Sequence, residues 1–534
     1  MLSLALFAPF LGAVRLFDWD EINFAECARE MIVTGDYLHV TIDYRPFYEK
    51  PPLFIWAQVL SMKVFGINEY AARFPNALIG MITMVVIFSI GTRLHGERMG
   101  WLWTLAYAGS LLPHFYFRSG IIDPMFNLFI FLAVYWLISS LQGAWLRNSI
   151  VAGVFAACAV MTKGPVGFGL AMLTFMIGWF VLRRQYTFPF KQILIATAVM
   201  TVLSSLWFVV DYVQNGPTFV MENLRYQVRL LTTGDAGHEQ PFWYHPVVVL
   251  LGCFPSSILL FGGLRKTEGE SNDQRTMRIF MIVLMCVVLI VFSIVKTKII
   301  HYSSMTYLPL TYLAALYMDR YLNGSAIFGT WKRSALLVFG TVWSFVVFGS
   351  LWAFMDRNWL TSLPTFRDPF LRSSIMRNVE WNGSEPAVGM FILVGVLGAL
   401  LLARKTPSLK IWLSLYGGVI LFVTVALPFV TPKIEPYTQG AALDFYESMR
   451  GKDVYIQPVS FKTYAHLFYQ QKPPSLSGAA KGVDPDKWFE HLLNDSLDKK
   501  AYFVSKVNNA EEWRNNDNLV ELYEEGGFVF FTKR

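Results

Sequence analysis

Long apolar blocks recur along almost the whole chain and constrain its fold more than any other feature. A helix needs about 20 mostly apolar residues, within a range of roughly 17–25, to cross a lipid bilayer. We therefore predict an all-α polytopic membrane protein with about thirteen transmembrane helices. The candidate spans are residues 1–17, 76–93, 101–117, 124–141, 149–162, 165–182, 192–212, 246–264, 278–295, 301–318, 334–354, 388–403 and 411–430.

Composition excludes the main alternatives. Of the 534 residues, 54% are hydrophobic and 16% are charged, whereas a soluble protein has about 25% charged residues. So much apolar surface excludes a soluble cytosolic enzyme, a fibrous protein and a disordered chain. Four cysteines are too few for a disulfide scaffold. The net charge of +7 is scattered between apolar blocks, which indicates membrane topology and not a nucleic-acid surface.

Every second loop is short and basic, and this alternation predicts the orientation. The basic residues in these loops are Arg93/Arg98, Arg147, Arg183/Arg184/Lys191, Arg265/Lys266/Arg275/Arg278, Arg320/Lys332/Arg333 and Arg404/Lys405/Lys410. Basic loops stay in the cytoplasm. The opposite loops, which hold nearly all the long polar segments, then lie outside the cytoplasm, and so does the C-terminus. The N-terminus is predicted inside.

Two alternatives concern single spans. Residues 149–162 and 165–182 are either two short helices or one long helix broken at Gly164-Pro165. Residues 1–17 are either a retained first helix or a signal peptide. Since no basic segment and no small-residue cleavage site precede Asp18, the retained helix is favoured.

The segment 431–534 changes composition and is predicted to be a small extracytoplasmic α/β domain, large enough for a core of its own. Helical patterns occupy 436–450, 462–470 and 486–495, and strand-like runs occupy 453–459 and 500–506. Residues 519–533 read as a hairpin that turns at Gly526-Gly527. The transmembrane domain is accordingly 1–430.

The first outer loop, residues 18–75, is unusually long. It opens with Asp18-Trp19-Asp20-Glu21, and a helical period follows until Gly35. That period predicts an amphipathic helix that lies at the membrane surface. A solvated connector is the plain alternative. Adjacent acids and bases beside apolar helix ends, such as Glu49 and Lys50, argue against a mere connector.

Further polar residues fall at span ends on the same predicted side. They are Asp123, Lys163, His238, Lys296 and Lys298, followed by Tyr302. Ionisable groups at membrane depth are costly and usually functional or paired. Each has a structural alternative: the lysines as snorkelling anchors, Asp123 as a helix cap, and His238 as an ordinary surface histidine. Their gathering on one side favours a site.

Acids and cations at the outer leaflet suit a reaction on an anionic lipid, such as sugar transfer from a polyprenyl phosphate. A carboxylate takes the proton of the acceptor, and Asp20 and Asp123 are the candidates. Cations stabilise the departing phosphate, with Lys50, Lys298 and Tyr302 as candidates. Glu21, Lys163 and Lys296 are further candidates for this site. Glu49 and His238 together are the predicted ligands of a divalent metal, since carboxylate and imidazole suit zinc or manganese.

Several of these residues form an ordered set over about residues 15–320. The pieces are Asp20-Glu21 with Phe24-Ala25-Glu26-Cys27-Ala28-Arg29-Glu30-Met31, Gly35-Asp36, Phe47-Tyr48-Glu49-Lys50-Pro51, Phe65-Gly66 with Asn68-Glu69 and Arg73, Asp123-Pro124, Met161-Thr162-Lys163-Gly164, His238 with Pro241-Phe242-Trp243-Tyr244, and Lys296-Thr297-Lys298 with Tyr302. In this set the chain resembles the bacterial aminoarabinose (lipid A) transferases, which are GT-C-type glycosyltransferases similar to the dolichyl-phosphate-mannose protein mannosyltransferases. The C-terminal third resembles them only in layout.

The resemblance implies an inverting transfer from an undecaprenyl-phosphate sugar at the periplasmic face. It implies that Asp20 is the main catalytic residue, that Asp123 assists, and that Lys50 and Tyr302 contact the lipid phosphate. It also implies a divalent metal, of zinc, manganese or magnesium, on Glu49 and His238. One departure stands out, because Asn23-Phe24 occupy the place of an Arg-Tyr pair of the family.

The missing arginine removes a phosphate-binding cation, for which Lys298, Arg118 or Arg45 are the candidate substitutes. This departure bears on the sugar and the acceptor more than on the reaction class. We predict a monomeric, multi-pass inner-membrane enzyme that uses a polyprenyl-phosphate sugar and modifies lipid A or another glycolipid. The alternatives are a protein O-glycosyltransferase of the same architecture and, less favoured, a lipid or sugar transporter or a sensor protein.

Overall fold

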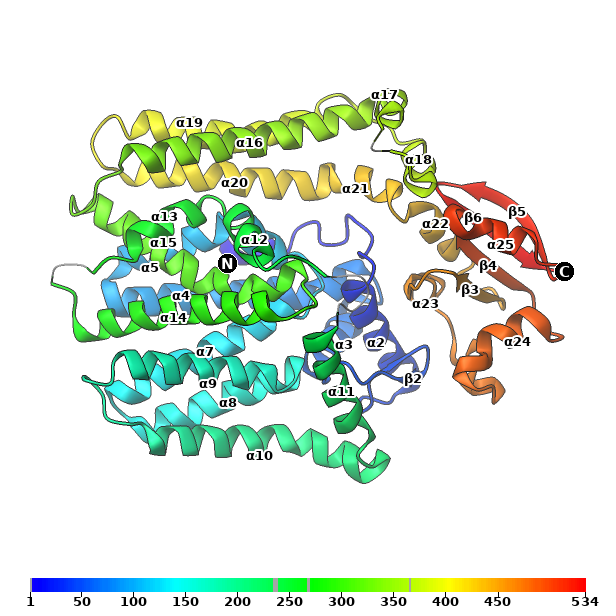
Figure 1. Cartoon of the computed structure of the whole chain (residues 1–534), viewed down its shortest axis with the longest axis horizontal. Coiled ribbons are helices and arrows are strands. Elements are labelled where there is room, and N and C mark those ends of the chain that lie inside the picture. The colour runs from blue at the N-terminus through cyan, green and yellow to red at the C-terminus, as the bar shows by residue number, and fades with distance from the viewer. Residues whose placement is uncertain (1, 234–238, 267–268, 365) are drawn as a thin grey trace.

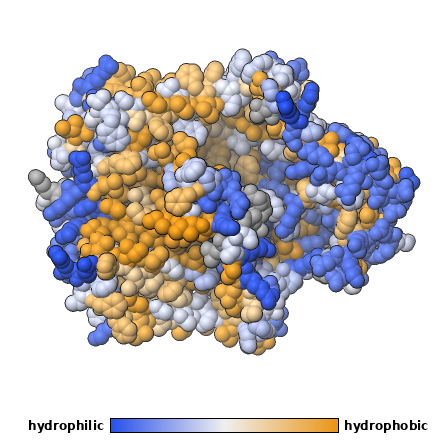
Figure 2. All heavy atoms as spheres, viewed as in Figure 1, coloured by the Kyte–Doolittle hydropathy of each residue, from blue (hydrophilic) through white to orange (hydrophobic). Residues whose placement is uncertain are grey.

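The computed structural model describes residues 2–233, 239–266, 269–364 and 366–534. A bundle of roughly antiparallel helices forms the larger part, and a mixed helix-and-sheet domain caps one end of it (Figure 1). The bundle carries a broad hydrophobic surface with hydrophilic residues concentrated towards its two ends (Figure 2). This distribution is typical of a chain that crosses a membrane.

The main helices of the bundle follow the apolar blocks. They are α4 (Glu69–His95), α5 (Glu97–Ala108), α6 (Leu111–Tyr116), α7 (Asp123–Gln142), α8 (Trp145–Lys163), α9 (Val166–Val181), α10 (Phe190–Asn215), α12 (Tyr244–Gly252), α13 (Ser256–Gly263), α14 (Asn272–Ile294), α15 (Tyr307–Leu322), α16 (Thr330–Met355), α19 (Met390–Leu402) and α20 (Leu409–Phe429). Among the described residues, eight helices are long and apolar enough to cross a membrane, or nine if α12 and α13, bent by 101°, form one span. The count of thirteen stays a prediction.

Two of the predicted spans can be compared with the structure in detail. The pair 149–162 and 165–182 forms two helices, α8 and α9, which are separated at Gly164 (φ +87°) and Pro165. The prediction of one helix over 1–17 is wrong, because the helix in this stretch, α1, covers only Leu2–Phe7. The backbone beyond α1 is not helical, and Arg73 donates hydrogen bonds to two of its carbonyls, Leu11 O (2.7 Å) and Val14 O (2.6 Å).

The first outer loop folds into a layer at one end of the bundle. It contains α2 (Asp20–Thr34), the strands β1 (Thr41–Ile42) and β2 (Arg45–Pro46), and α3 (Leu53–Phe65). As predicted, α2 ends at Gly35, which adopts a left-handed conformation (φ 76°). The prediction that this helix lies at a membrane surface is wrong, because every residue from Glu21 to Met31 is buried. Ion pairs within the protein neutralise its charges, including Glu26 with Arg29 (2.7 Å).

The C-terminal segment contains a four-stranded sheet with the order β3-β4-β6-β5. Its elements are α22 (Gly440–Ser448), β3 (Tyr455–Val459), α23 (Ala465–Gln470), α24 (Trp488–Asn494), β4 (Ala501–Lys506), α25 (Ala510–Arg514), β5 (Leu519–Glu525) and β6 (Phe528–Lys533). β3 and β4 are parallel, and the other neighbours are antiparallel. The hairpin turns at Gly526 and Gly527, as the sequence predicted, and both glycines have positive φ.

Shorter helices connect these parts. They are α11 (Thr218–Thr232), α17 (Arg357–Ser362), α18 (Pro369–Ile375) and α21 (Thr431–Ile434), with 3₁₀ turns at η2 (Ile300–Thr306), η3 (Glu385–Gly389), η4 (Glu435–Tyr437), η5 (Pro474–Leu476), η6 (Ala479–Lys481), η7 (Pro485–Lys487) and η8 (Val507–Asn509). Of these, α11 and η2 border the cavity described below.

The C-terminal domain has one core of its own and shares another with the first loop. Buried residues of α2 and α3, such as Ile22 and Ile55, belong to the same apolar cluster as Phe445 and Phe530 of the domain. A second cluster lies inside the domain. The prediction of an independent domain core is therefore incomplete, because the apolar faces of the loop and the domain cover each other.

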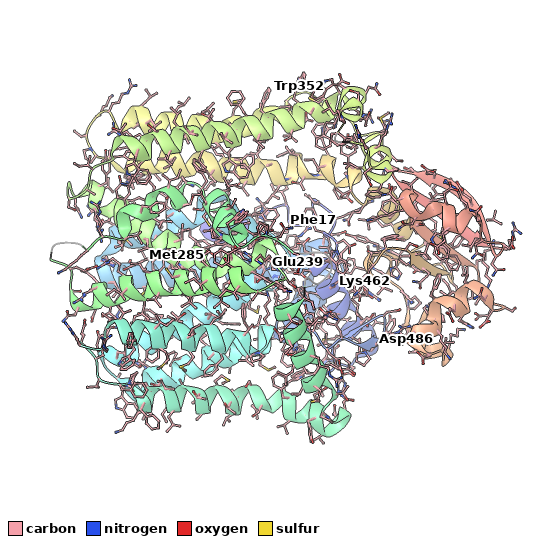
Figure 3. All side chains as sticks on the ribbon, viewed as in Figure 1. Phe17, Glu239, Met285, Trp352, Lys462 and Asp486 are labelled. Atoms are coloured by element: carbon pink, nitrogen blue, oxygen red, sulfur yellow. The ribbon has the colours of Figure 1, made fainter. Side chains whose placement is uncertain are left out.

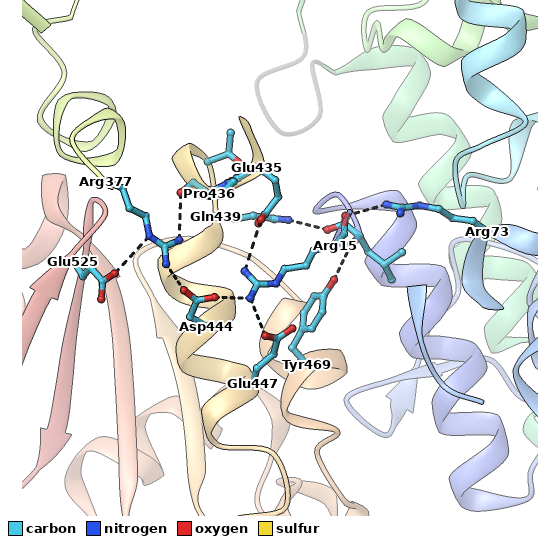
Figure 4. Close-up of polar contacts among 12 residues, drawn as sticks. Arg15, Arg73, Arg377, Glu435, Pro436, Gln439, Asp444, Glu447, Tyr469 and Glu525 are labelled. Atoms are coloured by element: carbon cyan, nitrogen blue, oxygen red, sulfur yellow. Dashed lines mark hydrogen bonds and ion pairs between the residues drawn. The ribbon is translucent and has the colours of Figure 1, made fainter. Parts of the chain in front are cut away.

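Polar contacts fix the domain to the N-terminal segment (Figure 4). Arg15 forms ion pairs with Glu447 (2.8 Å), Glu435 (3.7 Å) and Asp444. The Tyr469 hydroxyl accepts a hydrogen bond from Leu16 N at 2.7 Å. These contacts, together with the shared core, hold the domain over one end of the bundle.

Glu30 of α2 is a buried carboxylate that accepts hydrogen bonds from other residues of the first loop. One of its carboxylate oxygens accepts hydrogen bonds from Thr41 Oγ1 (2.7 Å) and from Tyr44 N (3.0 Å), and the other is buried without a partner. Burial, aided by the charge of Glu26, raises the pKa of Glu30 to about 8. An unfolded glutamate has a pKa of about 4.3. Between these values the folded chain binds more protons than the unfolded chain, so the free energy of unfolding falls as the pH rises.

We therefore predict that Glu30→Gln flattens this pH dependence. The amide oxygen keeps both hydrogen bonds and carries no charge, so the variant is expected to lose less thermal stability than the wild type between about pH 5 and 8. Thermal unfolding of the purified protein in detergent over this range measures the effect. Glu490→Gln, at an exposed glutamate, is the control. Equal slopes for Glu30→Gln and the wild type would contradict the assignment.

Candidate active site

A cavity of about 550 Å³ lies where the bundle, the first loop and the C-terminal domain meet. It is lined by Trp19, Asp20, Asn23, Glu49, Tyr226, Arg229, Leu230, Thr297, Ile299, Tyr302, Lys462 and Tyr464. Three of these residues, Asp20, Glu49 and Tyr302, were predicted as site residues from the sequence. They come from separate segments that the fold brings together at one end of the bundle.

Two carboxylates stand at the first residues of helices on this side. Asp20 begins α2, and Asp123 begins α7. The N-terminal end of a helix carries partial positive charge, which stabilises an ionised carboxylate there. The residue before α2, Trp19, has a φ of 73°, which is unusual for a residue with a side chain. This sharp turn brings the chain from the buried Leu16 into α2 with Asp20 on the cavity wall.

His301 connects the two carboxylates. Its Nε2 lies 3.2 Å from Asp20 Oδ2 and 3.9 Å from Asp123 Oδ2. The Asp20 side chain is 34% exposed, whereas that of Asp123 is 3% exposed. Asp20 is therefore the member of this group that an incoming molecule reaches. His301 was not among the site residues predicted from the sequence, although it directly precedes the candidate Tyr302.

Lys163 contacts Asp123, the buried carboxylate of this group. As the last residue of α8, it donates a hydrogen bond to Asp123 Oδ1 at 2.7 Å. Its ammonium also lies 5.1 Å from the centre of the Tyr302 ring, within range of a cation–π interaction. Lys163 thus neutralises Asp123 and holds the Tyr302 ring, and its role is more specific than that of a snorkelling anchor.

Lys50 contacts Tyr226, which lines the cavity. Its ammonium donates a hydrogen bond to the Tyr226 hydroxyl at 3.2 Å and lies 4.5 Å from the ring centre. Glu49 Oε2 lies 4.0 Å from the same ammonium. Tyr226 belongs to α11, which sequence analysis had read only as part of a polar loop. The amphipathic pattern of residues 218–232 was the sequence signal that could have identified this helix.

Other candidates have structural partners. Glu21 is buried and paired with Arg73 at 2.8 Å. Although burial acts to raise the pKa of Glu21, the Arg73 guanidinium holds it below its usual value. Arg118 is also buried, and it donates to Pro9 O at 2.6 Å. Neither residue lines the cavity.

The remaining predicted site residues either do not line the cavity or lie outside the described residues. Lys298 is buried and Lys296 is exposed, and neither lines the cavity. His238, the proposed partner of Glu49 for a metal, lies outside the described residues. Among the residues that are described, no three His, Cys, Asp or Glu side chains form a group that could hold a metal ion.

The geometry is that of a site for chemistry at an anionic substrate. The partly exposed carboxylate of Asp20 contacts the imidazole of His301. The carboxylate of Asp123 lies behind it and is paired with Lys163. Cations and phenol groups line the other walls. Such a site can take a proton from an incoming hydroxyl and stabilise negative charge on a leaving group.

Comparison with known proteins gives matches to a family model and to curated relatives. The family model for dolichyl-phosphate-mannose-protein mannosyltransferases matches residues 49–208. The undecaprenyl phosphate-alpha-4-amino-4-deoxy-L-arabinose arabinosyl transferase 2 of Proteus mirabilis is 26% identical over 433 residues, which cover 78% of this chain and 73% of that protein. The arabinosyl transferase of Edwardsiella ictaluri is 28% identical over 264 residues, which cover 47% of this chain and 46% of the relative, about half of each.

The structural comparison covers nearly the entire chain. The crystal structure of ArnT from Cupriavidus metallidurans bound to undecaprenyl phosphate matches with a TM-score of 0.77, over 99% of this chain and 96% of that protein. The chain is aminoarabinose-transferase-like in sequence and in fold. At 18% identity the structural match concerns the fold alone. The resemblance predicted from the sequence is confirmed.

The departure of this transferase-like chain at Asn23-Phe24 has a structural meaning. Asn23 lines the cavity, and its side-chain oxygen is buried without a partner. Phe24 lies in the bundle core against Phe54. The three cations suggested as substitutes, Lys298, Arg118 and Arg45, do not line this cavity. Arg229 and Lys462, which sequence analysis did not single out, do.

Proposed function

We propose that this chain is an integral membrane glycosyltransferase that moves one sugar from a polyprenyl phosphate, undecaprenyl phosphate in bacteria, to an acceptor outside the cytoplasm. Lipid A or another glycolipid is the proposed acceptor. The observation that carries the proposal is the contact of Asp20 with His301 at the wall of a cavity that is also lined by Tyr226, the hydrogen-bond partner of Lys50. The relatives support it, because they are named as undecaprenyl phosphate-dependent aminoarabinose transferases.

The proposed reaction uses these groups in turn. An acceptor oxygen forms a bond to the anomeric carbon of the sugar while the bond from that carbon to the polyprenyl phosphate oxygen breaks. The electron pair of the broken bond stays on the phosphate, near Lys50 and Tyr226. Asp20 takes the proton of the acceptor, and His301 holds the carboxylate in place. Attack from the side opposite the leaving phosphate inverts the configuration.

The proposed orientation places the cavity outside the cytoplasm. α7 starts and α8 ends beside the cavity, since Lys163 is paired with Asp123, and Asp123 lies 3.9 Å from His301, the partner of Asp20. The loop between them, next to Arg147, therefore lies at the other end of the bundle. Likewise α14 leads into η2 and α15 leads away from it, so the basic residues Arg265, Arg275 and Arg333 also lie at that end. The positive-inside rule assigns it to the cytoplasm.

A divalent metal on Glu49 and His238 remains a separate proposal. Glu49 lines the cavity, and a carboxylate there suits a divalent cation. Since the described residues offer no complete ligand group, the reaction above is derived without a step through a metal.

Metal analysis of the purified protein tests this separate proposal. Glu49→Ala and His238→Ala are each expected to lower the bound zinc, manganese or magnesium, because each removes one ligand. His491→Ala, at a histidine paired with Asp495 in the C-terminal domain, is the control. Unchanged metal content in both variants, or none in the wild type, would end the proposal.

The reaction is tested by Asp20→Asn. The amide cannot take a proton, so transfer is expected to fall by about 10²–10⁴-fold or more, while thermal stability stays near that of the wild type because Asp20 is partly exposed. Transfer is measured with purified protein and an undecaprenyl-phosphate sugar, and by mass spectrometry of lipid A, other glycolipids and glycoproteins from cells.

Asp486→Asn is the control for this experiment, because Asp486 is exposed in the C-terminal domain (Figure 3) and does not line the cavity that holds Asp20. Normal turnover by Asp20→Asn would refute the catalytic assignment. Modified proteins in place of modified glycolipids would favour protein O-glycosylation, which the match to the protein mannosyltransferase model also allows.

Donor binding is tested by Lys50→Ala. Loss of the cation near the leaving phosphate is expected to raise the donor KM about tenfold or more, since a charge-assisted hydrogen bond contributes about 1.5–3 kcal/mol. Steady-state kinetics with varied donor measures the change. Lys63→Ala is a matched control, because the Lys63 ammonium lies 4.2 Å from the ring centre of Tyr37, which does not line the cavity, whereas Lys50 contacts the cavity residue Tyr226. Equal donor KM values for Lys50→Ala and Lys63→Ala would exclude Lys50 from the phosphate site.

A further inference from the structure

One cation of the active-site cavity comes from the C-terminal domain. Lys462 lies between β3 and α23, and it faces the first loop at the junction of the domain and the bundle (Figure 3). It lines the same cavity as Asp20. Its ammonium lies 5.5 Å from the ring centres of both Trp19 and Tyr464. The domain therefore contributes a charged side chain to the wall where the acceptor must meet Asp20.

Lys462 also lines two neighbouring cavities. One, of about 370 Å³, lies between the start of the first loop and the domain and includes Asp18, Trp19 and Lys506. The other, of about 300 Å³, includes Arg45 and His466. Lys462 thus joins the three cavities into a path from the domain interface to Asp20.

The cations along this path differ from the others at the interface. Arg15, Arg377 and Lys472 are each paired with an acidic residue. In contrast, no ion pair within 4.0 Å joins Lys462 or Lys506 to a carboxylate in the described parts of the chain. The Lys506 ammonium instead lies 4.7 Å from the Phe370 ring centre.

Arg45 adds a third cation of this kind. Its Nε and Nη2 are buried without a hydrogen-bond partner. His466, which is 7% exposed and lines the same cavity, has a buried Nδ1 that also lacks a partner. Buried donors without partners are costly and mark places where a ligand completes the hydrogen bonds.

The acidic residues near this path are occupied. Asp18 accepts a hydrogen bond from Trp19 N at 2.9 Å and another from the Thr463 side chain. Asp43 is paired with Lys472 at 2.6 Å. Asp18 also interacts electrostatically with Lys506. Lys462 and Arg45 therefore remain without an acidic partner in the described chain, and an anion with several oxygen atoms would bind them. The aromatic rings beside Lys462 supply surfaces on which a sugar ring packs.

We propose that Lys462, with Lys506 and Arg45, binds the phosphorylated headgroup of the glycolipid acceptor and positions it for attack at the cavity that holds Asp20. This inference rests on the proposed function for its reaction. The donor phosphate is assigned to another wall, formed by Tyr226 of α11, which Lys50 contacts. Separate phosphate sites on the two walls keep donor and acceptor apart until the anomeric carbon lies between them.

Binding to the full-length protein in detergent provides a test that does not need turnover. The probes are bisphosphorylated lipid A and the same lipid with its phosphates removed, and tryptophan fluorescence reports the titration. The wild type is expected to bind the phosphorylated lipid at least tenfold more tightly. Lys462→Gln is expected to remove most of this preference, and Lys462→Arg to keep it. Lys452→Gln, at an exposed lysine of the same domain, is the control.

Kinetics separate this proposal from the proposed function. Lys462→Gln is expected to raise the acceptor KM about tenfold and to leave the donor KM unchanged. Lys506→Gln, which changes a different wall of the path, is a second variant in case Lys462→Gln does not fold. Equal affinity for the two lipids, or variants that bind like the wild type, would overturn the acceptor site. Lysine-dependent binding without any sugar transfer would instead refute the proposed function and leave the site in place.

Discussion

The buried ion pair between Glu21 and Arg73 positions most of the active site. Arg73 of α4 binds the Glu21 carboxylate at 2.8 Å and also donates to backbone carbonyls of the N-terminal segment. Glu21 in turn accepts hydrogen bonds from Phe17 N and from Gly120 N. One carboxylate therefore fixes the turn before Asp20 and the loop that leads to Asp123. Breaking such a pair leaves an uncompensated buried charge, at a cost of about 3–5 kcal/mol.

Some charged residues of this protein form buried ion pairs and others do not, and the two sets have different roles. Pairs such as Arg29 with Glu26 and Arg278 with Glu270 balance each other in buried surroundings and need no further ligand. The groups at the cavity are arranged differently: Asp20 remains partly exposed, and Lys462 has no carboxylate partner in the described chain. Unbalanced charge costs stability, so its concentration at one cavity is expected of a binding site.

The C-terminal domain is part of the site through the same packing. Its apolar face shares a cluster with α2 and α3, and that burial turns what the sequence suggested was a surface helix into an internal one. Because α2 is enclosed, the position of Asp20 depends on the domain as well as on the bundle. The fold thus joins the apolar helix bundle to a polar layer at one end of it (Figure 2).

The sequence by itself determined the membrane class, the order of most helices, the hairpin at Gly526 and the placement of acids at the starts of α2 and α7. These features depend on hydropathy over about 20 residues and on local caps and turns, which neighbouring residues encode. Only the tertiary structure decided that His301 meets Asp20, that Tyr226 meets Lys50 and that Lys462 reaches the cavity. It also decided that residues 8–17 are not helical and that α2 is buried. These contacts join segments far apart in the chain, and their free energy comes from packing and ion pairing across the fold, for which no local pattern exists.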